Sequence, residues 1–436
     1  MTSRRQFLGR GGAAAGAAAL AWSGRARGAA AAETITLGAI GCGGQGTGLI
    51  KKFAALDGVE VAYVCDPDGA RAGAAAEAVG KATGRTPKVV TDLRRVLDDR
   101  SVDAVTVATP DHWHAPATIL ACDAGKHVYV EKPCAHNFRE GRLMVETARR
   151  TKRIVQHGTQ SRTNPVVLRA IRLIREGAIG DVLVARAFNV QQRRSIGHAT
   201  PSDPPRGFDY DLWVGPAPLV SFQANRHHYS WHWWYDFGTG DMGNDGVHEL
   251  DIARWGLGMD EHPATIAAVG GKYYFDDDQQ FPDTQTVAFE YPAAAPSGRP
   301  RQLVFEMRIW SPYQPDGEEN GNILYGTEGW MLLCKKGVVR LYDRKGKPRP
   351  VTGELPASRG HQADFVAAIR DGRDPAAEIG IGFRSAALCH LGNIATRLGR
   401  TIHFDPATEK VVGDDEANRL LGRSYRPGHW AVPRGV

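Results

Sequence analysis

Between residues 34 and 157, short apolar runs alternate with longer segments in which apolar residues recur every three or four positions. The short runs are continuous, which is typical of strands buried on both faces of a sheet, and the longer segments have the spacing of helices. The predicted strands are Thr34–Ile40, Val59–Cys65, Val102–Ala108, His127–Glu131 and Arg153–His157, and the predicted helices lie near Gly46–Leu56, Gly69–Thr83, Ala115–Asp123 and Phe138–Thr151. This alternation predicts a parallel, doubly wound sheet covered by helices on both faces.

After about residue 160 the pattern changes, because strand-like runs follow one another with less helix between them. The predicted strands there are Asp181–Val190, Ala264–Tyr274, Thr284–Tyr291, Gln302–Ile309, Asn322–Tyr325 and Trp330–Leu333, and helices return at His361–Arg370 and Phe383–Leu398. This order is typical of an α+β domain with an open, mostly antiparallel sheet. We therefore predict an α/β protein with one domain at 33–158 and a second at 159–436, whose terminal helices and tail begin near 361.

The first 32 residues have a different composition. The twin arginines Arg4 and Arg5 precede a weakly apolar run rich in Ala and Gly, which ends in four alanines at 29–32. This pattern predicts a twin-arginine signal peptide at 1–32, recognised by the Tat export machinery, and a periplasmic location. Glycines interrupt the apolar run, so we expect no stable membrane span after cleavage. A disordered basic N-terminus is the alternative.

The leader also explains much of the basic charge. Five of the 54 Lys and Arg residues lie in it and none of the 48 Asp and Glu residues does, so the remainder carries 49 basic and 48 acidic side chains. That balance gives no support for nucleic-acid binding. The six cysteines show no C-x-x-C spacing, so neither a disulfide framework nor a zinc site is expected.

A glycine-rich turn follows the first predicted strand. Gly41, Gly43 and Gly46 form a G-x-G-x-x-G pattern, and Asp66 ends the second strand 20 residues beyond Gly46. In a Rossmann domain such a turn holds the pyrophosphate at a helix N-terminus, and the later carboxylate binds the adenosine ribose. Asp66 would repel a 2′-phosphate, which favours NAD; NADP is the alternative, since Arg71 lies nearby in sequence.

Four further motifs follow in order: Thr109–His114 (TPDHWH), Glu131–Pro133 (EKP), Gly240–Asp251 (GDMGNDGVHELD) and Tyr325–Trp330 (YGTEGW). Together with the glycine turn, they resemble the Gfo/Idh/MocA oxidoreductases, over nearly all of the chain beyond the leader. The resemblance implies a Rossmann domain and a substrate domain whose open sheet often mediates oligomer formation. It also implies a tightly held NAD or NADP and a sugar or polyol substrate, so we expect a homo-oligomer.

By this resemblance Lys132 is the catalytic lysine. It follows a strand and precedes a proline, which would aim its side chain into the crevice at the strand ends. A lysine there can stabilise an alkoxide as hydride leaves; a solvated turn lysine is the alternative. The resemblance places four more residues near the cofactor: Thr109, Pro110, His114 and Glu131. For His114, a structural role in capping the next helix is the alternative.

His248 matches the family's active-site histidine, the expected acceptor of the substrate hydroxyl proton. Asp251 lies three residues later on a predicted helix, so it could orient the imidazole. The family commonly has Asp four residues before this histidine, whereas this chain has Asn244, which can hydrogen-bond a sugar hydroxyl but cannot exchange protons. A packing histidine at a helix start is the alternative for His248.

Residues 225–237 (NRHHYSWHWWYDF) combine aromatic, histidine and arginine side chains. Aromatic faces suit sugar rings and flanking polar groups suit hydroxyls, so we predict Arg226, His232 and Trp233 as substrate-binding residues, with Asn244 and Asp251. An oligomer interface or a core is the alternative. Four histidines, at 227, 228, 232 and 248, could in principle bind a metal, but they lack helical His-x-x-x-His spacing, and we predict none.

The combined prediction is an exported NAD(P)-dependent oxidoreductase that transfers hydride between a cofactor and a hydroxyl of a sugar, glycoside or cyclitol. One alternative is a redox-neutral enzyme of the same fold, which cleaves a glycoside through a transient keto-sugar. A second alternative is a non-catalytic periplasmic sugar-binding protein that keeps a nucleotide for structure.

Overall fold

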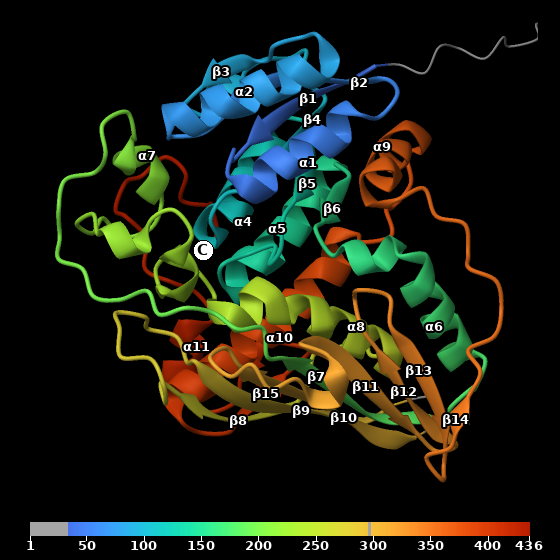
Figure 1. Ribbon diagram of the computed structural model, residues 1–436. Coiled ribbons are helices and arrows are strands. Elements are labelled where there is room, and N and C mark those ends of the chain that lie inside the picture. Colours follow the sequence, from blue (N-terminus) through green and yellow to red (C-terminus); the bar gives the residue numbers. More distant parts are fainter. Residues whose placement is uncertain (1–33, 295–297) are drawn as a thin grey trace, which may run out of the picture. The chain divides into compact units, whose positions relative to one another are not determined.

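A computed structural model describes residues 34–294 and 298–436 of the chain (Figure 1). The predicted signal peptide at 1–32 lies outside the described residues. Residues 34–436 form one compact unit, in which two sheets are each covered by helices. No helix within the described residues is long and apolar enough to cross a membrane.

The first sheet is parallel and has six strands in the order β3-β2-β1-β4-β5-β6. The order reverses between β1 and β4, which is where doubly wound sheets bind their ligands. Its strands are β1 (Ile35–Ile40), β2 (Val59–Cys65), β3 (Lys88–Val90), β4 (Ala104–Val107), β5 (His127–Val130) and β6 (Val155–His157). The helices between them are α1 (Gly44–Ala54), α2 (Gly69–Thr83), α3 (Arg94–Leu97), α4 (Asp111–Asp123) and α5 (Phe138–Thr151).

Side-chain caps fix where two of these helices begin. The Asp68 carboxylate accepts from the N–H of Ala70 (3.0 Å) at the start of α2, and Asn137 accepts from the N–H of Glu140 (3.0 Å) at the start of α5. Helix α1 has no such cap. Its first N–H groups are therefore available to a ligand.

The second sheet has ten strands in the order β14-β13-β12-β11-β7-β10-β9-β8-β15-β16, and only the β7–β10 pair is parallel. Helices α8 (Val247–Leu257) and α10 (Ile379–Leu398) pack on the face of this sheet that is directed toward the first sheet (Figure 1). The strands are β7 (Val182–Asn189), β8 (Thr265–Gly271), β9 (Thr284–Ala294), β10 (Arg299–Arg308), β11 (Asn320–Gly326), β12 (Gly329–Leu333), β13 (Val339–Asp343), β14 (Pro348–Arg349), β15 (Ile402–Asp405) and β16 (Lys410–Val411). The remaining longer helices are α6 (Pro165–Arg175), α9 (His361–Asp371) and α11 (Asp415–Leu420). The predicted fold class is thus confirmed.

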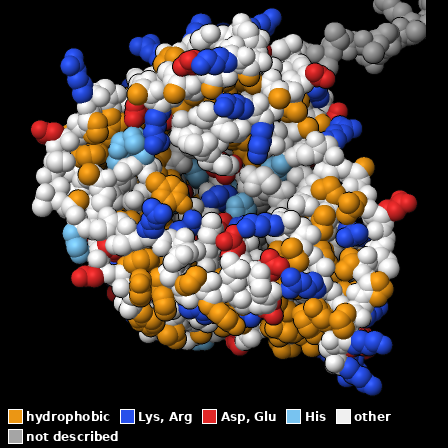
Figure 2. Space-filling model, in the orientation of Figure 1, with side chains coloured by type: hydrophobic (Ala, Val, Ile, Leu, Met, Phe, Trp, Pro, Cys, Tyr) orange, Lys and Arg blue, Asp and Glu red, His pale blue; other side chains and the backbone are white. Residues whose placement is uncertain are grey.

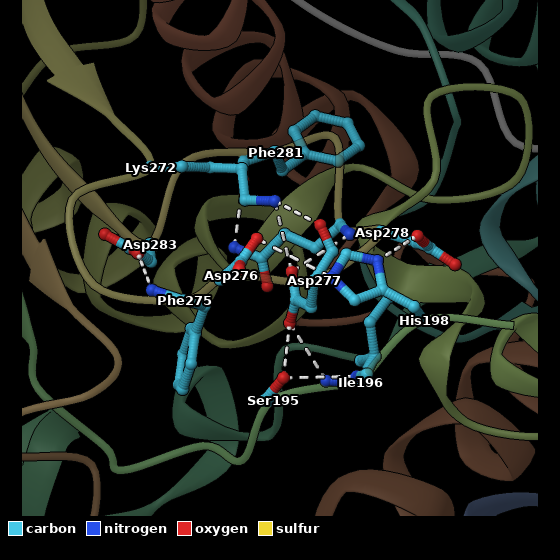
Figure 3. A network of polar contacts seen from close by, with 12 residues as sticks. Ser195, Ile196, His198, Lys272, Phe275, Asp276, Asp277, Asp278, Phe281 and Asp283 are labelled. Atoms are coloured by element: carbon cyan, nitrogen blue, oxygen red, sulfur yellow. Dashed lines mark hydrogen bonds and ion pairs between the residues drawn. The ribbon is translucent and has the colours of Figure 1, made fainter.

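Residues 191–237, here called the cover segment, form little regular structure beyond the short helix α7 (Tyr210–Val214) and single turns. A polar network fixes its start (Figure 3). In this network the buried Asp277 accepts from the Ser195 hydroxyl (3.0 Å) and the Ile196 N–H (2.9 Å), and Asp278 contacts His198 (2.7 Å). Lys272 also lies 3.2 Å from Asp277, so this carboxylate ties the segment to the loop between β8 and β9.

The middle of the cover segment lies against the first sheet's connections. The N–H of Gly69 donates to the carbonyl of Gly207 (3.2 Å), and the N–H of Asp209 donates to the carbonyl of Pro67 (2.8 Å). These bonds join the cover segment to the turn between β2 and α2. The segment therefore crosses the carboxyl ends of the first sheet's strands, above the ligand-binding edge.

Candidate active site

A cavity of about 740 Å³ lies at the carboxyl ends of the strands of the first sheet, between that sheet, the cover segment and the start of α8. Figure 2 shows it as a hollow with basic and histidine side chains at its floor. Its volume is in the range of small-molecule and cofactor sites. The predicted site residues that line it are Gly41, Gly43, Gly46, Asp66, Thr109, Pro110, His114, Glu131, Lys132, His232, Asn244 and His248.

Gly41 and Gly46 of the glycine turn leave no room for a side chain. Gly41 has φ +91°, and a Cβ there would lie 2.4 Å from the carbonyl oxygen of Ala108. A Cβ on Gly46 would lie 2.0 Å from the carbonyl oxygen of Gly41. The backbone thus opens toward the cavity next to the uncapped start of α1, an arrangement that fits a pyrophosphate.

Asp66 lies at the end of β2 on the cavity wall and is 8% exposed. One carboxylate oxygen accepts from the N–H of Cys42 (2.7 Å) and the other from the N–H of Asp68 (2.9 Å). Burial raises the pKa of Asp66, and these two N–H donors oppose that shift. The two bonds fix the carboxylate beside the glycine turn, where an adenosine ribose would meet it.

Two predicted cofactor residues hold the neighbouring strand ends together. The His114 ring contacts the carbonyl oxygens of Pro133 (2.6 Å) and Thr109 (2.9 Å), so it bridges the ends of β4 and β5. Burial lowers the pKa of His114 to about 4. Glu131 accepts from the Gln45 amide (2.9 Å), which connects β5 to α1. Both side chains also line the cavity, so their place beside the cofactor stays a prediction. His114 lies inside α4 and bridges two strand ends, and it does not cap that helix.

Lys132 meets Asn244 inside the cavity. Its ammonium group donates to the backbone carbonyl of Asn244 and lies 3.2 Å from the side-chain oxygen. Asn244 in turn donates to Asp241 (3.0 Å), a fully buried carboxylate that also accepts from Arg193 (3.0 Å) and from Asn189 (2.9 Å). The amide that replaces the family's usual carboxylate therefore serves as a fixed link between the lysine and a buried acid.

The Asn244 region is a single π-helical turn, Met242–Gly246, that runs directly into α8. Such turns are rare in proteins, and those that occur are often found at functional sites. His248 lies in the first turn of α8 and lines the same cavity as Lys132. Burial, and then the charges of Lys335 and Lys132, hold the pKa of His248 well below 6.5. The imidazole is neutral at neutral pH and can accept a proton.

Asp251 does not have its predicted role. Its carboxylate accepts from Arg162 (2.8 Å to each oxygen) and from the Ser385 hydroxyl (2.7 Å), and it is fully buried outside the cavity lining. The spacing of three residues does place Asp251 on the same helix as His248. Its oxygens, however, are committed to an ion pair that joins α8 to the segment before α6.

The aromatic prediction is also corrected in part. Arg226 donates to the carbonyl of Ser221 (2.8 Å) and packs over the ring of Trp234 (4.2 Å), so it stabilises the cover segment. Trp233 is 3% exposed and belongs to the core. Within residues 225–237, the indole on the cavity wall is that of Trp231, which stacks on His232 with ring centroids 3.6 Å apart.

Four charged residues behind the site were not predicted from the sequence. Lys335, just after β12, contacts Asp245 (2.6 Å) and Glu249 (3.2 Å), and Asp241 anchors Asn244. Burial raises the pKa of Glu249 to about 8. Asp241 and Asp245 stand in the GDMGND motif, so two acids beside Asn244 were a signal that could have been read. Lys335 had none, because it comes from a distant strand end.

One group of potential metal ligands occurs among the described residues. Single ligand atoms of Asp68, His227 and His228 lie within 4.8 Å of one another, and His228 contacts Asp68 at 3.0 Å. The Arg71 guanidinium lies 4.0 Å from the same Asp68 oxygen, so a cation would meet a positive charge there. We assign no metal to this group, and the absence of a metal stays a prediction.

Comparison with protein families gives two matches. The family described as "Oxidoreductase family, NAD-binding Rossmann fold" matches residues 35–159. The one described as "Oxidoreductase family, C-terminal alpha/beta domain" matches residues 187–292 and 347–432. Together they cover the first sheet and part of the second, without β10 to β13, and they bear out the predicted NAD-binding domain.

Among curated proteins, the chain is 32% identical over 178 residues to glycosyl hydrolase family 109 protein 1 of Shewanella sp. (strain ANA-3) and to the alpha-N-acetylgalactosaminidase of Shewanella oneidensis. Each match covers 39% of this chain and 39% of the relative's length. Among solved structures, the aldose-aldose oxidoreductase of Caulobacter crescentus complexed with glycerol has a TM-score of 0.63 and 21% identity, covering 85% of this chain and 100% of that one. A levoglucosan dehydrogenase complexed with NADH and levoglucosan has a TM-score of 0.63 and 19% identity, covering 85% and 99%. At these identities the solved structures support the fold alone.

Proposed function

Because this chain belongs to the oxidoreductase family with the NAD-binding Rossmann fold, we propose that it is an NAD-dependent oxidoreductase acting on a hydroxyl of a sugar, glycoside or cyclitol. The observation that carries this proposal is that Lys132 and His248, from different sheets' connections, line one cavity with the glycine turn. Beside a nucleotide cradle, a neutral imidazole can act as the base and a lysine can stabilise the developing charge in the oxidation of an alcohol.

Bound NAD supplies the acceptor of a hydride from the substrate carbon. The protein's own groups handle the proton and the charge. His248 is neutral at neutral pH, so it accepts the hydroxyl proton, and the Lys132 ammonium stabilises the negative charge that develops on the oxygen. Asn244 holds Lys132 through two oxygens, which restricts the lysine to the cavity wall.

The cover segment supports a carbohydrate substrate. Trp231 presents a flat indole on the cavity wall, stacked on His232, and such faces suit the apolar side of a sugar ring. Asn244 also borders the cavity and offers amide groups to hydroxyls.

Redox-neutral cleavage of a glycoside is the second candidate. The names of the two Shewanella relatives, glycosyl hydrolase family 109 protein 1 and alpha-N-acetylgalactosaminidase, favour it. In this reaction the sugar leaves at its original redox level and the aglycone is released. His248, which accepts the proton in the oxidoreductase, and Lys132, which stabilises the charge, would serve here as well.

Export is proposed on the sequence alone: the twin arginines support passage through the Tat machinery into the periplasm as a folded protein. A homo-oligomer is proposed from the open face of the ten-stranded sheet. The non-catalytic sugar-binding protein remains the competing outcome in the experiment below.

The test supplies the purified full chain with NAD and a panel of free sugars, cyclitols and nitrophenyl glycosides, and identifies products by mass spectrometry. A ketone or lactone product supports the oxidoreductase, and an unoxidised sugar with free nitrophenol supports cleavage. Lys132→Met is expected to lower turnover by about 100-fold or more. Lys51→Met, which removes an exposed lysine of α1, is the matched control and should not change turnover. Sugar binding without any turnover would refute both enzymatic proposals.

A further inference from the structure

The far end of the cavity, away from Lys132, is where an adenine base would lie. Asp66 marks the position of the adenosine ribose, and the sheet continues from β2 to β3 beyond it. Thr91, Asp92 and Leu93 follow β3 and line the cavity there. The base therefore extends toward the end of β3, while the nicotinamide end faces Lys132 and His248.

Trp430, from the segment 426–436 that is here called the tail, forms a wall of this end of the cavity. The Arg94 guanidinium, at the start of α3, lies 4.4 Å from the centre of its indole ring, and the Trp113 ring is 5.8 Å away. Trp213 of α7 lines the cavity as well, and its backbone carbonyl accepts from the Trp113 indole N–H (2.9 Å).

The tail that carries Trp430 is held in place. The N–H of Arg426 donates to the carbonyl of Pro216 (2.9 Å), and its guanidinium pairs with Asp211 (2.7 Å). Ala431, next to Trp430, is buried. The tail is thus bound to the cover segment, and the two form a continuous wall over the adenosine half of the cavity.

From these contacts we infer that the C-terminal tail, residues 426–436, completes a subsite for the adenine base of the dinucleotide, with Trp430 as its aromatic wall. The tail retains the cofactor during turnover, because the base leaves only when Trp430 moves. This role concerns the purine end alone and is independent of which sugar, if any, the nicotinamide end oxidises.

The experiment measures exchange of the bound cofactor. The purified full chain, loaded with NAD, is mixed with an excess of deuterium-labelled NAD, and protein-bound nucleotide is analysed by mass spectrometry over time. Contact of a base with an aromatic side chain is typically worth a factor of about 5 to 150 by alanine substitution, so Trp430→Ala should speed exchange by that factor. Trp330→Ala is the matched control, since Trp330 stacks on Tyr342 in the outer strands of the second sheet and should exchange at the wild-type rate.

Two further variants keep the test decisive if Trp430→Ala does not fold. Trp430→Phe keeps a flat ring and should exchange close to the wild-type rate, whereas Trp430→Leu keeps apolar bulk without a ring and should exchange faster. Exchange at the wild-type rate in the Ala and Leu variants would overturn the inference, as would equal acceleration in Trp330→Ala. No sugar is present in this assay, so failure of the proposed oxidoreductase activity would leave its result unaffected.

Discussion

Replacing Asp251 with Asn should destabilise the protein without removing a reacting group. The Asp251 carboxylate is fully buried and receives three hydrogen bonds, two from Arg162 and one from Ser385. Arg254, itself 1% exposed, lies 3.8 Å from the same carboxylate. Asparagine keeps the shape but removes the charge, so two buried guanidinium groups would face a neutral amide.

The size of the effect follows from the pKa of Asp251. Burial raises this pKa, but Arg162 and the hydrogen bonds outweigh burial and bring it to about 2. Against an unfolded-state pKa of about 3.9, the difference contributes about 2.5 kcal/mol to stability at neutral pH. Because the folded pKa is the lower one, this contribution is present above about pH 4 and is lost as the pH falls toward 2. Removing one partner of a buried ion pair typically costs about 3–5 kcal/mol. We therefore expect Asp251→Asn to lower the free energy of unfolding by about 2.5 to 5 kcal/mol.

The assay is guanidinium denaturation followed by tryptophan fluorescence, with saturating NAD for every variant. Asp260→Asn is the matched control, since Asp260 contacts the same Arg254 at 3.2 Å but its side chain is 87% exposed. Because water solvates the exposed Asp260 carboxylate, its pair with Arg254 contributes little, about 1 kcal/mol at most, and this variant should remain near the wild type. The difference in free energy of unfolding between the wild type and Asp251→Asn should become smaller below pH 4. Wild-type stability combined with a large loss of turnover would refute this reasoning and restore Asp251 as a partner of His248.

Three further outcomes are expected. Gly46→Ala puts a methyl group 2.0 Å from the carbonyl oxygen of Gly41 and should abolish co-purification of NAD, whereas Gly48→Ala, whose methyl group meets nothing within 4 Å, should retain NAD. Equal NAD content per chain in the two variants, measured by absorbance, would contradict this. Since burial and two lysines hold the pKa of His248 well below 6.5, kcat/KM should remain constant through pH 6.5, and an acidic limb centred there would count against His248 as the base. Asn244→Asp places a second carboxyl group 3.0 Å from the nearest Asp241 oxygen, so the pair should share a proton and add an ionisation to the kcat–pH profile; an unchanged profile would show that residue 244 is not coupled to turnover.

Local pattern was sufficient for most of the first sheet. Its buried strands are continuous apolar runs in the sequence, and the spacing of the three glycines is itself a sequence signature of the nucleotide-binding turn. The exception is β3, Lys88–Val90, a three-residue edge strand that is largely exposed and therefore lacks an apolar run. The cover segment was not predicted, since its position depends on bonds to Pro67 and Gly69 rather than on its own pattern.

The site shows the same limit at the level of single side chains. The spacing of His248 and Asp251 correctly put them on one helix, but Arg162, which decides where Asp251 points, lies 89 positions away in the sequence. Likewise, the aromatic composition near residue 230 indicated an indole at the cavity. Only the fold of the 3₁₀ turn Ser230–Trp233 decides that it is Trp231 and not Trp233.

The position of Trp430 has a consequence for the order in which the chain folds. Arg423 donates to the carbonyl of His112, which lies 311 positions away in the sequence. Trp430 contacts side chains of α3 and α4, which are similarly distant from it along the chain. The first sheet can form early in folding, but its nucleotide chamber stays unfinished until the segment that carries Arg423 and Trp430 packs against it. Contacts of such long separation form late and slowly. The Rossmann domain therefore cannot complete its nucleotide chamber as an independent folding unit, and we expect it to hold the nucleotide securely only after the second domain has folded as well.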